Sequence, residues 1–204
     1  MDLNLFGGVF VTLLVIMDPP GMMPIFLALT GPLSARERNR AAWQAVALAL
    51  GVIVVFAVAG QTLLAYLHVD LPALQAAGGL LLILVALELL TGKTDDPTKQ
   101  TTSNIALVPL GTPLLAGPGA IVATMLFVQQ AESAGDHFAI AIAIVAVMLT
   151  VWIVLRFSGG IVRVLRPGGI EVVTRIAGLL LAAIAVQLIA DAIFAFVADF
   201  TGAA

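Results

Sequence analysis

Residues 17–30 read MDPPGMMPIFLALT, and residues 113–121 read PLLAGPGAI. Each stretch interrupts a long apolar run with proline and glycine, at DPPG (18–21) in the first and GPG (117–119) in the second. Proline has no N–H and clashes with the preceding turn of a helix, whereas glycine tolerates backbone angles that other residues avoid. The two stretches therefore predict two broken helices.

The composition around these breaks is typical of a membrane protein. The chain has 204 residues, of which 61% are hydrophobic and 10% are charged, and its mean hydropathy is +1.14. A soluble domain carries about 25% charged residues, and a membrane-spanning helix needs about 20 apolar residues. The sequence contains no cysteine, which excludes disulfides and thiolate metal sites. Six spans use nearly the whole chain, at residues 3–30, 41–66, 71–91, 104–130, 137–157 and 172–200.

The chain also repeats itself with an offset of 99 residues and no gap. Shifted in this way, Pro19 falls on Pro118, Gly60 falls on Gly159, and the sequence GLLL that begins at Gly79 recurs at Gly178. Each repeat holds three spans, so the second repeat enters the membrane from the opposite side. We therefore expect an all-α polytopic membrane protein with six transmembrane helices in two inverted three-helix repeats, in which helices 1 and 4 are discontinuous. The expected divisions of this single membrane domain are 1–92 for repeat 1, 93–103 for a cytoplasmic linker and 104–204 for repeat 2.

Basic residues give the expected orientation. All nine lie in or next to the first, third and fifth gaps between the spans, and cytoplasmic loops carry the excess of lysine and arginine. We therefore expect a multi-pass protein of the cell membrane, with loops 1, 3 and 5 in the cytoplasm and both chain ends outside. The lipid bilayer is the expected surrounding, and no nucleic-acid partner is expected. The nine residues are Arg36, Arg38, Arg40, Lys93, Lys99, Arg156, Arg163, Arg166 and Arg175.

Two proline- and glycine-interrupted spans at corresponding positions are the best sequence pointer to the binding site of a transporter. A broken helix frees carbonyl groups before the break and N–H groups after it, and these groups must be buried or line a watery cavity. The second half-helices, expected from about Met22 and Ala120, offer N–H donors to a carboxylate, and the freed carbonyls suit an ammonium group or a cation. A zwitterionic amino acid needs both; a proline kink used only for packing is the alternative at either break. The expected substrate-binding residues are Asp18, Pro19, Pro20, Gly21, Met22, Gly117, Pro118, Gly119 and Ala120.

Two acidic residues are candidates for proton coupling. Asp18 lies at the first break. Placing a charged carboxylate inside the membrane costs free energy, so such a residue marks a functional site by default. It could pair with a substrate ammonium, take up a coupling proton or cap the half-helix. Glu88 lies near the end of the third span, where contact with lipid headgroups is the simpler interpretation. No metal and no cofactor is expected.

The two interrupted stretches, together with Arg36, resemble the first-span and second-repeat signatures of the MarC family of bacterial and archaeal membrane proteins. The AGG sequence at 77–79 and the AG sequence at 177–178 also match, and these glycines are expected to allow close helix contact. The resemblance covers essentially the whole chain, although Asp18 and Met22 stand where the family often has asparagine. It implies six spans in two inverted repeats and transport of small neutral amino acids such as glycine and alanine, in the direction of export.

Two other classes of function fit the sequence less well. An aquaporin-like channel for small neutral solutes also has two half-helix breaks, but neither break here carries Asn-Pro-Ala, and no arginine lies mid-span to serve as a pore filter. A membrane-embedded enzyme would need an intramembrane Ser/His pair or a His-Glu-x-x-His motif, and both histidines, His68 and His137, lie in expected loops. We therefore expect a secondary transporter that works by alternating access, and no enzyme. A proton or cation is the expected coupling partner, and the channel is the alternative.

Overall fold

The computed structural model describes residues 3–92 and 115–201, and these residues form helices without any strand. The chain is therefore all-helical, as predicted. The expected linker at 93–103 and the first part of the fourth span, at 104–114, lie outside the described residues. The helices are α1 (Leu3–Met17), α2 (Pro19–Thr30), α3 (Ala35–Leu67), α4 (Leu71–Thr91), α5 (Pro118–Gln129) and α6 (Ala134–Thr201).

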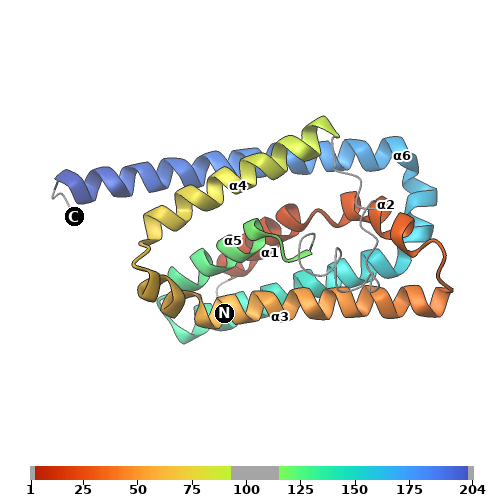
Figure 1. Ribbon diagram of the computed structural model, residues 1–204, viewed down its shortest axis with the longest axis horizontal. Coiled ribbons are helices and arrows are strands. Elements are labelled where there is room, and N and C mark those ends of the chain that lie inside the picture. Colours follow the sequence, from red (N-terminus) through yellow and green to blue (C-terminus); the bar gives the residue numbers. More distant parts are fainter. Residues whose placement is uncertain (1–2, 93–114, 202–204) are drawn as a thin grey trace.

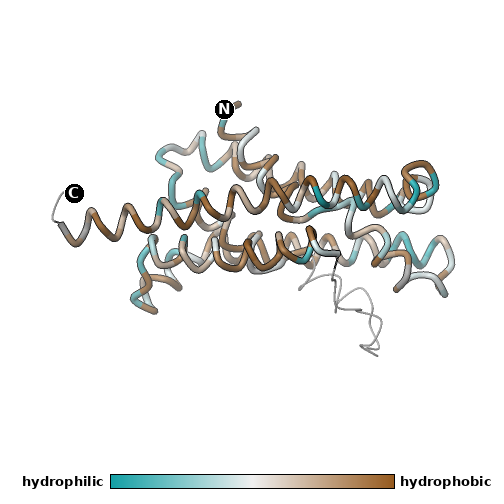
Figure 2. The backbone as a smooth tube through the Cα atoms, turned by 90° about the horizontal axis from the view of Figure 1, so that it is seen from above, coloured by the Kyte–Doolittle hydropathy of each residue, from teal (hydrophilic) through white to brown (hydrophobic). Residues whose placement is uncertain are grey.

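The helices have the length and composition of membrane spans. Four described segments are long and apolar enough to cross a bilayer, and α5 is apolar but shorter. Large apolar side chains cover their outer faces, as at Val58 and Phe194, which are 77% and 74% exposed. Figure 2 shows helices that are hydrophobic along most of their length, with hydrophilic residues gathered mainly near the turns. A contiguous apolar surface of this kind is unfavourable in water and suits lipid. The four segments are Leu3–Leu27, Ala35–Leu67, Leu71–Thr91 and Ala134–Ala198.

The long helix α6 contains the fifth and sixth expected spans. It is interrupted at Arg166, whose backbone is not helical (φ 57°, ψ 165°), directly before Pro167. The ring of a proline disfavours helical angles for the residue before it, which explains the position of the interruption. The helix bends there, so that its first part (134–165) lies along α3 and its second part (167–201) lies along α4 (Figure 1). The interruption is confined to this single non-helical residue.

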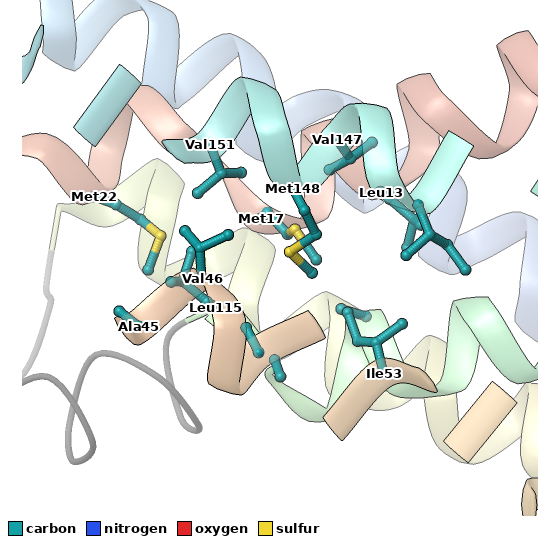
Figure 3. Close-up of a cluster of buried hydrophobic side chains, with 14 of the residues drawn as sticks. Leu13, Met17, Met22, Ala45, Val46, Ile53, Leu115, Val147, Met148 and Val151 are labelled. Atoms are coloured by element: carbon teal, nitrogen blue, oxygen red, sulfur yellow. The ribbon is translucent and has the colours of Figure 1, made fainter. Parts of the chain in front are cut away.

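The larger core lies between α1, α2, α3, α5 and the first part of α6 (Figure 3). Leu13, Ile53 and Val147 are fully buried there. The face of α3 that enters this core is built largely of alanine. In a bilayer the hydrophobic effect does not drive helices together, so their association depends on packing, and small residues let neighbouring helices approach closely. The buried alanines of this face are Ala42, Ala45 and Ala49.

A second, smaller core joins α4 to the second part of α6, and it is built around two glycines. A Cβ added at Gly79 would lie 2.8 Å from the carbonyl oxygen of Ala185, and a Cβ added at Gly178 would lie 3.2 Å from the carbonyl oxygen of Ala86. A side chain at either position would press on the backbone of the opposite helix. The prediction that these glycines allow close helix contact is therefore confirmed.

The 99-residue offset of the sequence recurs in the bounds of the helices. Pro19 and Pro118 begin α2 and α5, and Thr30 and Gln129 end them. The starts of α3 and α6 are also 99 residues apart, and the serine before each makes the same pair of hydrogen bonds with an acidic residue three positions later, known as a capping box.

The distances at these two caps are similar. At α3, the Ser34 N–H donates to Glu37 Oε2 at 2.9 Å, and Ser34 Oγ accepts from the Glu37 N–H at 3.4 Å. At α6, the Ser133 N–H donates to Asp136 Oδ2 at 3.0 Å, and Ser133 Oγ accepts from the Asp136 N–H at 3.2 Å. Positions related by the 99-residue offset therefore form the same local structure at these two helix starts.

Candidate functional site

Asp18 separates α1 from α2. Its backbone is left-handed (φ 39°, ψ 64°), which is uncommon for a residue other than glycine, and two prolines follow it. Hydrogen bonds nevertheless continue across it: the Asp18 N–H donates to the Leu14 carbonyl and the Met22 N–H donates to the Asp18 carbonyl, both at 3.1 Å. The first break is therefore a sharp bend at one residue and not an unwound stretch.

The helices after the breaks begin earlier than the sequence analysis predicted. They start at Pro19 and Pro118, not at Met22 and Ala120. Proline is favoured at the first helical position, where its missing N–H would have no partner in any case.

The donors available at these helix starts also differ from those predicted. The Met22 N–H is bonded to Asp18, and the Ala120 N–H donates to the Gly117 carbonyl at 3.0 Å, so neither is free. Because proline has no N–H, the donors that remain in the first turns belong to Gly21 and Gly119. Within 3–92 and 115–201, neither of these N–H groups has a backbone acceptor.

A cavity of about 190 Å³ lies where the two helix starts meet, and we call it the break cavity. The sequence analysis placed its polar residues on separate segments, and the structure brings them to one cavity. Pro19 and Pro20 do not line it, and the side chain of Pro118 is outside what the structure describes. The predicted residues that line the break cavity are Asp18, Gly21, Met22, Glu88, Gly117, Gly119 and Ala120.

The carboxylate of Asp18 is buried in this cavity beside a residue that the sequence analysis missed. Asp18 is 5% exposed, and Thr174 reaches the same place from the second part of α6. A Cβ added at Gly21 would lie 2.9 Å from Asp18 Cγ and 3.0 Å from Thr174 Oγ1, so the absence of a side chain there makes room for both groups.

These two polar groups lack well-formed hydrogen bonds. Asp18 Oδ2 and Thr174 Oγ1 are buried without a hydrogen bond of good geometry among the described residues, although the Thr174 hydroxyl and the Gly21 N–H both approach the Asp18 carboxylate. Nearly all buried polar atoms in folded proteins are hydrogen-bonded. A molecule or ion in the cavity would complete the hydrogen bonding of this carboxylate and hydroxyl.

Apolar side chains form the rest of the wall and keep the break cavity small. Leu82 of α4 is fully buried, and its Cδ2 fills the place that a side chain at Gly119 would occupy. Ile16 Cγ2 would lie 3.5 Å from the same added Cβ. Glu88 lies on the same helix as Leu82 and is exposed, so the cavity connects a buried carboxylate with an accessible one. No cluster of three or more candidate metal ligands occurs in the described part of the chain.

The apolar helices and their small internal cavity define a helical integral membrane protein. The sequence pattern described as "MarC family integral membrane protein" matches residues 3–197, and the chain belongs to this family. The resemblance drawn from residues 17–30 and 113–121 is thereby confirmed.

Relatives match along nearly their whole length. A membrane protein of Methanocaldococcus jannaschii is 34% identical over 200 residues, which cover 95% of this chain and 98% of that protein. The inner membrane protein MarC of Salmonella paratyphi B is 30% identical over 219 residues, with 98% and 99% covered. No solved structure matches the chain.

Proposed function

We propose that this protein is a secondary transporter of small neutral amino acids such as glycine and alanine, working by alternating access in the direction of export. The observation that carries the proposal is the break cavity, where two helix starts converge on two buried oxygens, Asp18 Oδ2 and Thr174 Oγ1, that have no hydrogen bond of good geometry among the described residues. Its volume of about 190 Å³ is below the roughly 300–1,000 Å³ of pockets for drug-sized ligands, which favours a small substrate.

The residues of the break cavity suit the two charges of an amino acid. The Asp18 carboxylate would accept the substrate ammonium, and the Thr174 hydroxyl would add a further polar contact. The N–H group of Gly119, in the first turn of α5, would donate to the substrate carboxylate, because helix starts carry a partial positive charge. The two helix starts would thus supply polar contacts in place of those that a zwitterion loses when it leaves water.

The inverted three-helix repeat, with its six spans and with helices 1 and 4 discontinuous, is part of this proposal. The reciprocal glycine contacts support it: Gly79 meets Ala185 and Gly178 meets Ala86, and a shift by 99 residues exchanges one contact for the other. Two contacts that exchange in this way are typical of two halves related by a twofold axis. The same pairs make α4 and the second part of α6 antiparallel (Figure 1), as equivalent helices of inverted repeats are.

We propose an orientation with loops 1, 3 and 5 in the cytoplasm, in the cell membrane. The distribution of basic residues supports it, and the Salmonella relative is named an inner membrane protein. Because the chain has no native cysteine, single cysteines at Ser34, His68, Thr98 and Ser133 can be labelled in intact cells. An impermeant reagent should reach positions 68 and 133 only; labelling at 34 and 98 instead would reverse the orientation.

Coupling to protons would use the two carboxylates of the break cavity. Asp18 is buried and Glu88 is exposed, so a proton could reach the buried group through the space that the substrate occupies. We propose no enzymatic activity and no metal or cofactor for the protein.

The experiment that tests the proposal is uptake and counterflow of a panel of amino acids in proteoliposomes. Glycine and alanine transport should saturate and should be driven by counterflow from preloaded vesicles. Solute flux that neither saturates nor counterflows would favour the aquaporin-like channel, which the paired helix starts would also accommodate. Absence of flux for every small neutral amino acid would exclude the proposed substrates.

A further inference from the structure

A second cavity, of about 500 Å³, lies at the end of the molecule where α3 begins and α6 bends. It shares no residue with the break cavity. We call it the bend cavity, because one wall is the start of α3 and the other is the stretch of α6 that precedes the non-helical Arg166. None of the residues predicted to bind substrate lies in it.

Two arginines line the bend cavity without an opposing carboxylate. Arg38 comes from α3 and Arg156 from α6, and in the described part of the chain no acidic residue lines the cavity. The only ion pair within 3–92 and 115–201 joins Arg175 to Glu171, and the Arg156 guanidinium lies over the ring of Phe157 at 5.5 Å. The cavity therefore offers two cationic groups whose natural complement is an anion.

Two uncharged polar side chains add to this wall. The Oδ1 of Asn39 is buried and has no hydrogen-bond partner among the described residues. Ser158, on the α6 side, is 1% exposed. A phosphodiester group alone has no proton to donate to the Asn39 oxygen, whereas a lipid headgroup that carries hydroxyls beyond its phosphate does. The polar wall thus favours an occupant with both an anionic group and a hydrogen-bond donor.

The remainder of the wall is apolar and reaches the outer surface of the helices. Leu155 is buried at the inner side, Ile161 is half-buried, and Val164 is 82% exposed at the outer side. A free inorganic anion gains nothing from such a wall, but an acyl chain does. Basic pockets between membrane helices near the bilayer surface are the known way in which proteins hold anionic lipid headgroups.

We propose that the bend cavity binds an anionic phospholipid with a hydroxylated headgroup, such as phosphatidylglycerol. The phosphate lies between Arg38 and Arg156, a headgroup hydroxyl donates to Asn39 Oδ1, and an acyl chain follows the apolar wall toward Val164. This inference requires only that the chain is a membrane protein; it does not depend on what the break cavity transports.

The two tryptophans of the chain are placed to report on the bend cavity. Trp43 and Trp152 pack edge to face with ring centres 6.5 Å apart. Trp43 follows Arg38 and Trp152 precedes Arg156, each by about one helical turn. Their fluorescence in vesicles of brominated phosphatidylcholine should therefore recover as unbrominated phosphatidylglycerol displaces the quenching lipid from the cavity.

The wild-type protein is compared with the double variant Arg38→Gln/Arg156→Gln and with a control of equal charge, Arg40→Gln/Arg163→Gln, whose arginines are exposed outside the cavity. Wild type and control should prefer phosphatidylglycerol over phosphatidylcholine, and the cavity variant should lose roughly fivefold of this preference for each arginine. The lysine version of the cavity variant retains the charge and should keep most of the preference, which distinguishes lost binding from lost folding.

Three outcomes would overturn the proposal. The wild type could show no preference for the anionic lipid, or the cavity and control variants could lose it equally, which would indicate diffuse surface charge. Inorganic phosphate added to the vesicles could reverse the recovery of fluorescence, which would identify a free anion as the ligand. A preference that survives phosphate and depends on Arg38 and Arg156 supports a bound lipid.

Discussion

At the first break the residue before the prolines is Asp18, charged and left-handed, whereas at the second break it is Gly117, uncharged and extended (φ −62°, ψ 163°). The helices that follow are nevertheless equal in length, at 12 residues each. Proline at the first helical position sets both starts, so the backbone of the two regions is governed by the residue that they share. The chemistry is governed by the residue in which they differ.

The surroundings of the two breaks differ in the same way. Thr174 lines the break cavity beside Asp18, but Gln75, which lies 99 residues before Thr174, is buried elsewhere and does not line it. One end of the cavity therefore carries polar side chains and the other carries mainly backbone. Two helix starts of equal length can in this way hold a site whose two ends differ in chemistry.

The largest effect is expected from removing the charge that distinguishes the two breaks. Asp18→Ala should lower the affinity for glycine and alanine about ten- to hundredfold, because a hydrogen bond to a charged group contributes roughly 1.5–3 kcal/mol. Gly117→Ala, at the corresponding position, should change affinity little, since alanine readily adopts its extended backbone. Concentration-dependent uptake into proteoliposomes measures both. Equal effects of the two substitutions would show that the breaks contribute alike.

The next effect concerns the packing that relates the two halves. Gly79→Val should destabilise the protein by about 1–3 kcal/mol, because its side chain would press on the Ala185 carbonyl. Gly178→Val should act in the same direction and somewhat less, since an added Cβ there lies farther from the opposing carbonyl. Gly51→Val, in a helical position with open space around it, is the control. Thermal unfolding in detergent would contradict the reciprocal contact if the control lost as much stability.

A third comparison places a methyl group at each helix start. Gly21→Ala should weaken substrate affinity about tenfold, since the methyl group must displace the Asp18 carboxylate and approach Thr174. Gly119→Ala should have a smaller effect, because it meets mainly the flexible end of Leu82, whereas Gly119→Val should block binding. Binding of labelled glycine to the purified protein gives both affinities. A stronger effect at Gly119→Ala than at Gly21→Ala would place the substrate nearer the second break.

The smallest effect should be the same in both halves. Ser34→Ala and Ser133→Ala each remove a capping box and should each cost about 1 kcal/mol of stability. The measurement is the midpoint of unfolding for each single variant. A clearly unequal loss would show that the repeated cap has different importance in the two halves.

The sequence was sufficient to place an interruption at Asp18, because the effects of proline and glycine on a helix are local; the expected helix before Gly117 lies mostly outside the described residues, so the second break stays a prediction. The sequence also contained the signal for the helix starts at Pro19 and Pro118, since proline favours the first helical turn. The predicted starts were later because the prolines were assigned to unwound backbone between two half-helices. The bend at Arg166 likewise follows from the proline after it.

Thr174 could not be predicted in the same way. It lies between Glu171 and Arg175 after the bend of α6, and whether it faces α2 depends on how far the helix is rotated at Arg166. No pattern of residues specifies that rotation. Glu88 was interpreted as a headgroup contact for a similar reason: its position along α4 was clear, but the neighbour that its side chain faces depends on how α4 packs.

The lengths of α3 and α4 have a consequence for the thickness of bilayer that the protein tolerates. At about 1.5 Å of rise per residue, the 33 residues of α3 extend about 50 Å, while the 21 residues of α4 extend about 31 Å. A hydrocarbon layer is about 30 Å thick, so α4 has almost no surplus length, whereas α3 can tilt or extend into the headgroups. In a thicker bilayer the mismatch would therefore fall first on α4, and through its glycine contact on the second part of α6.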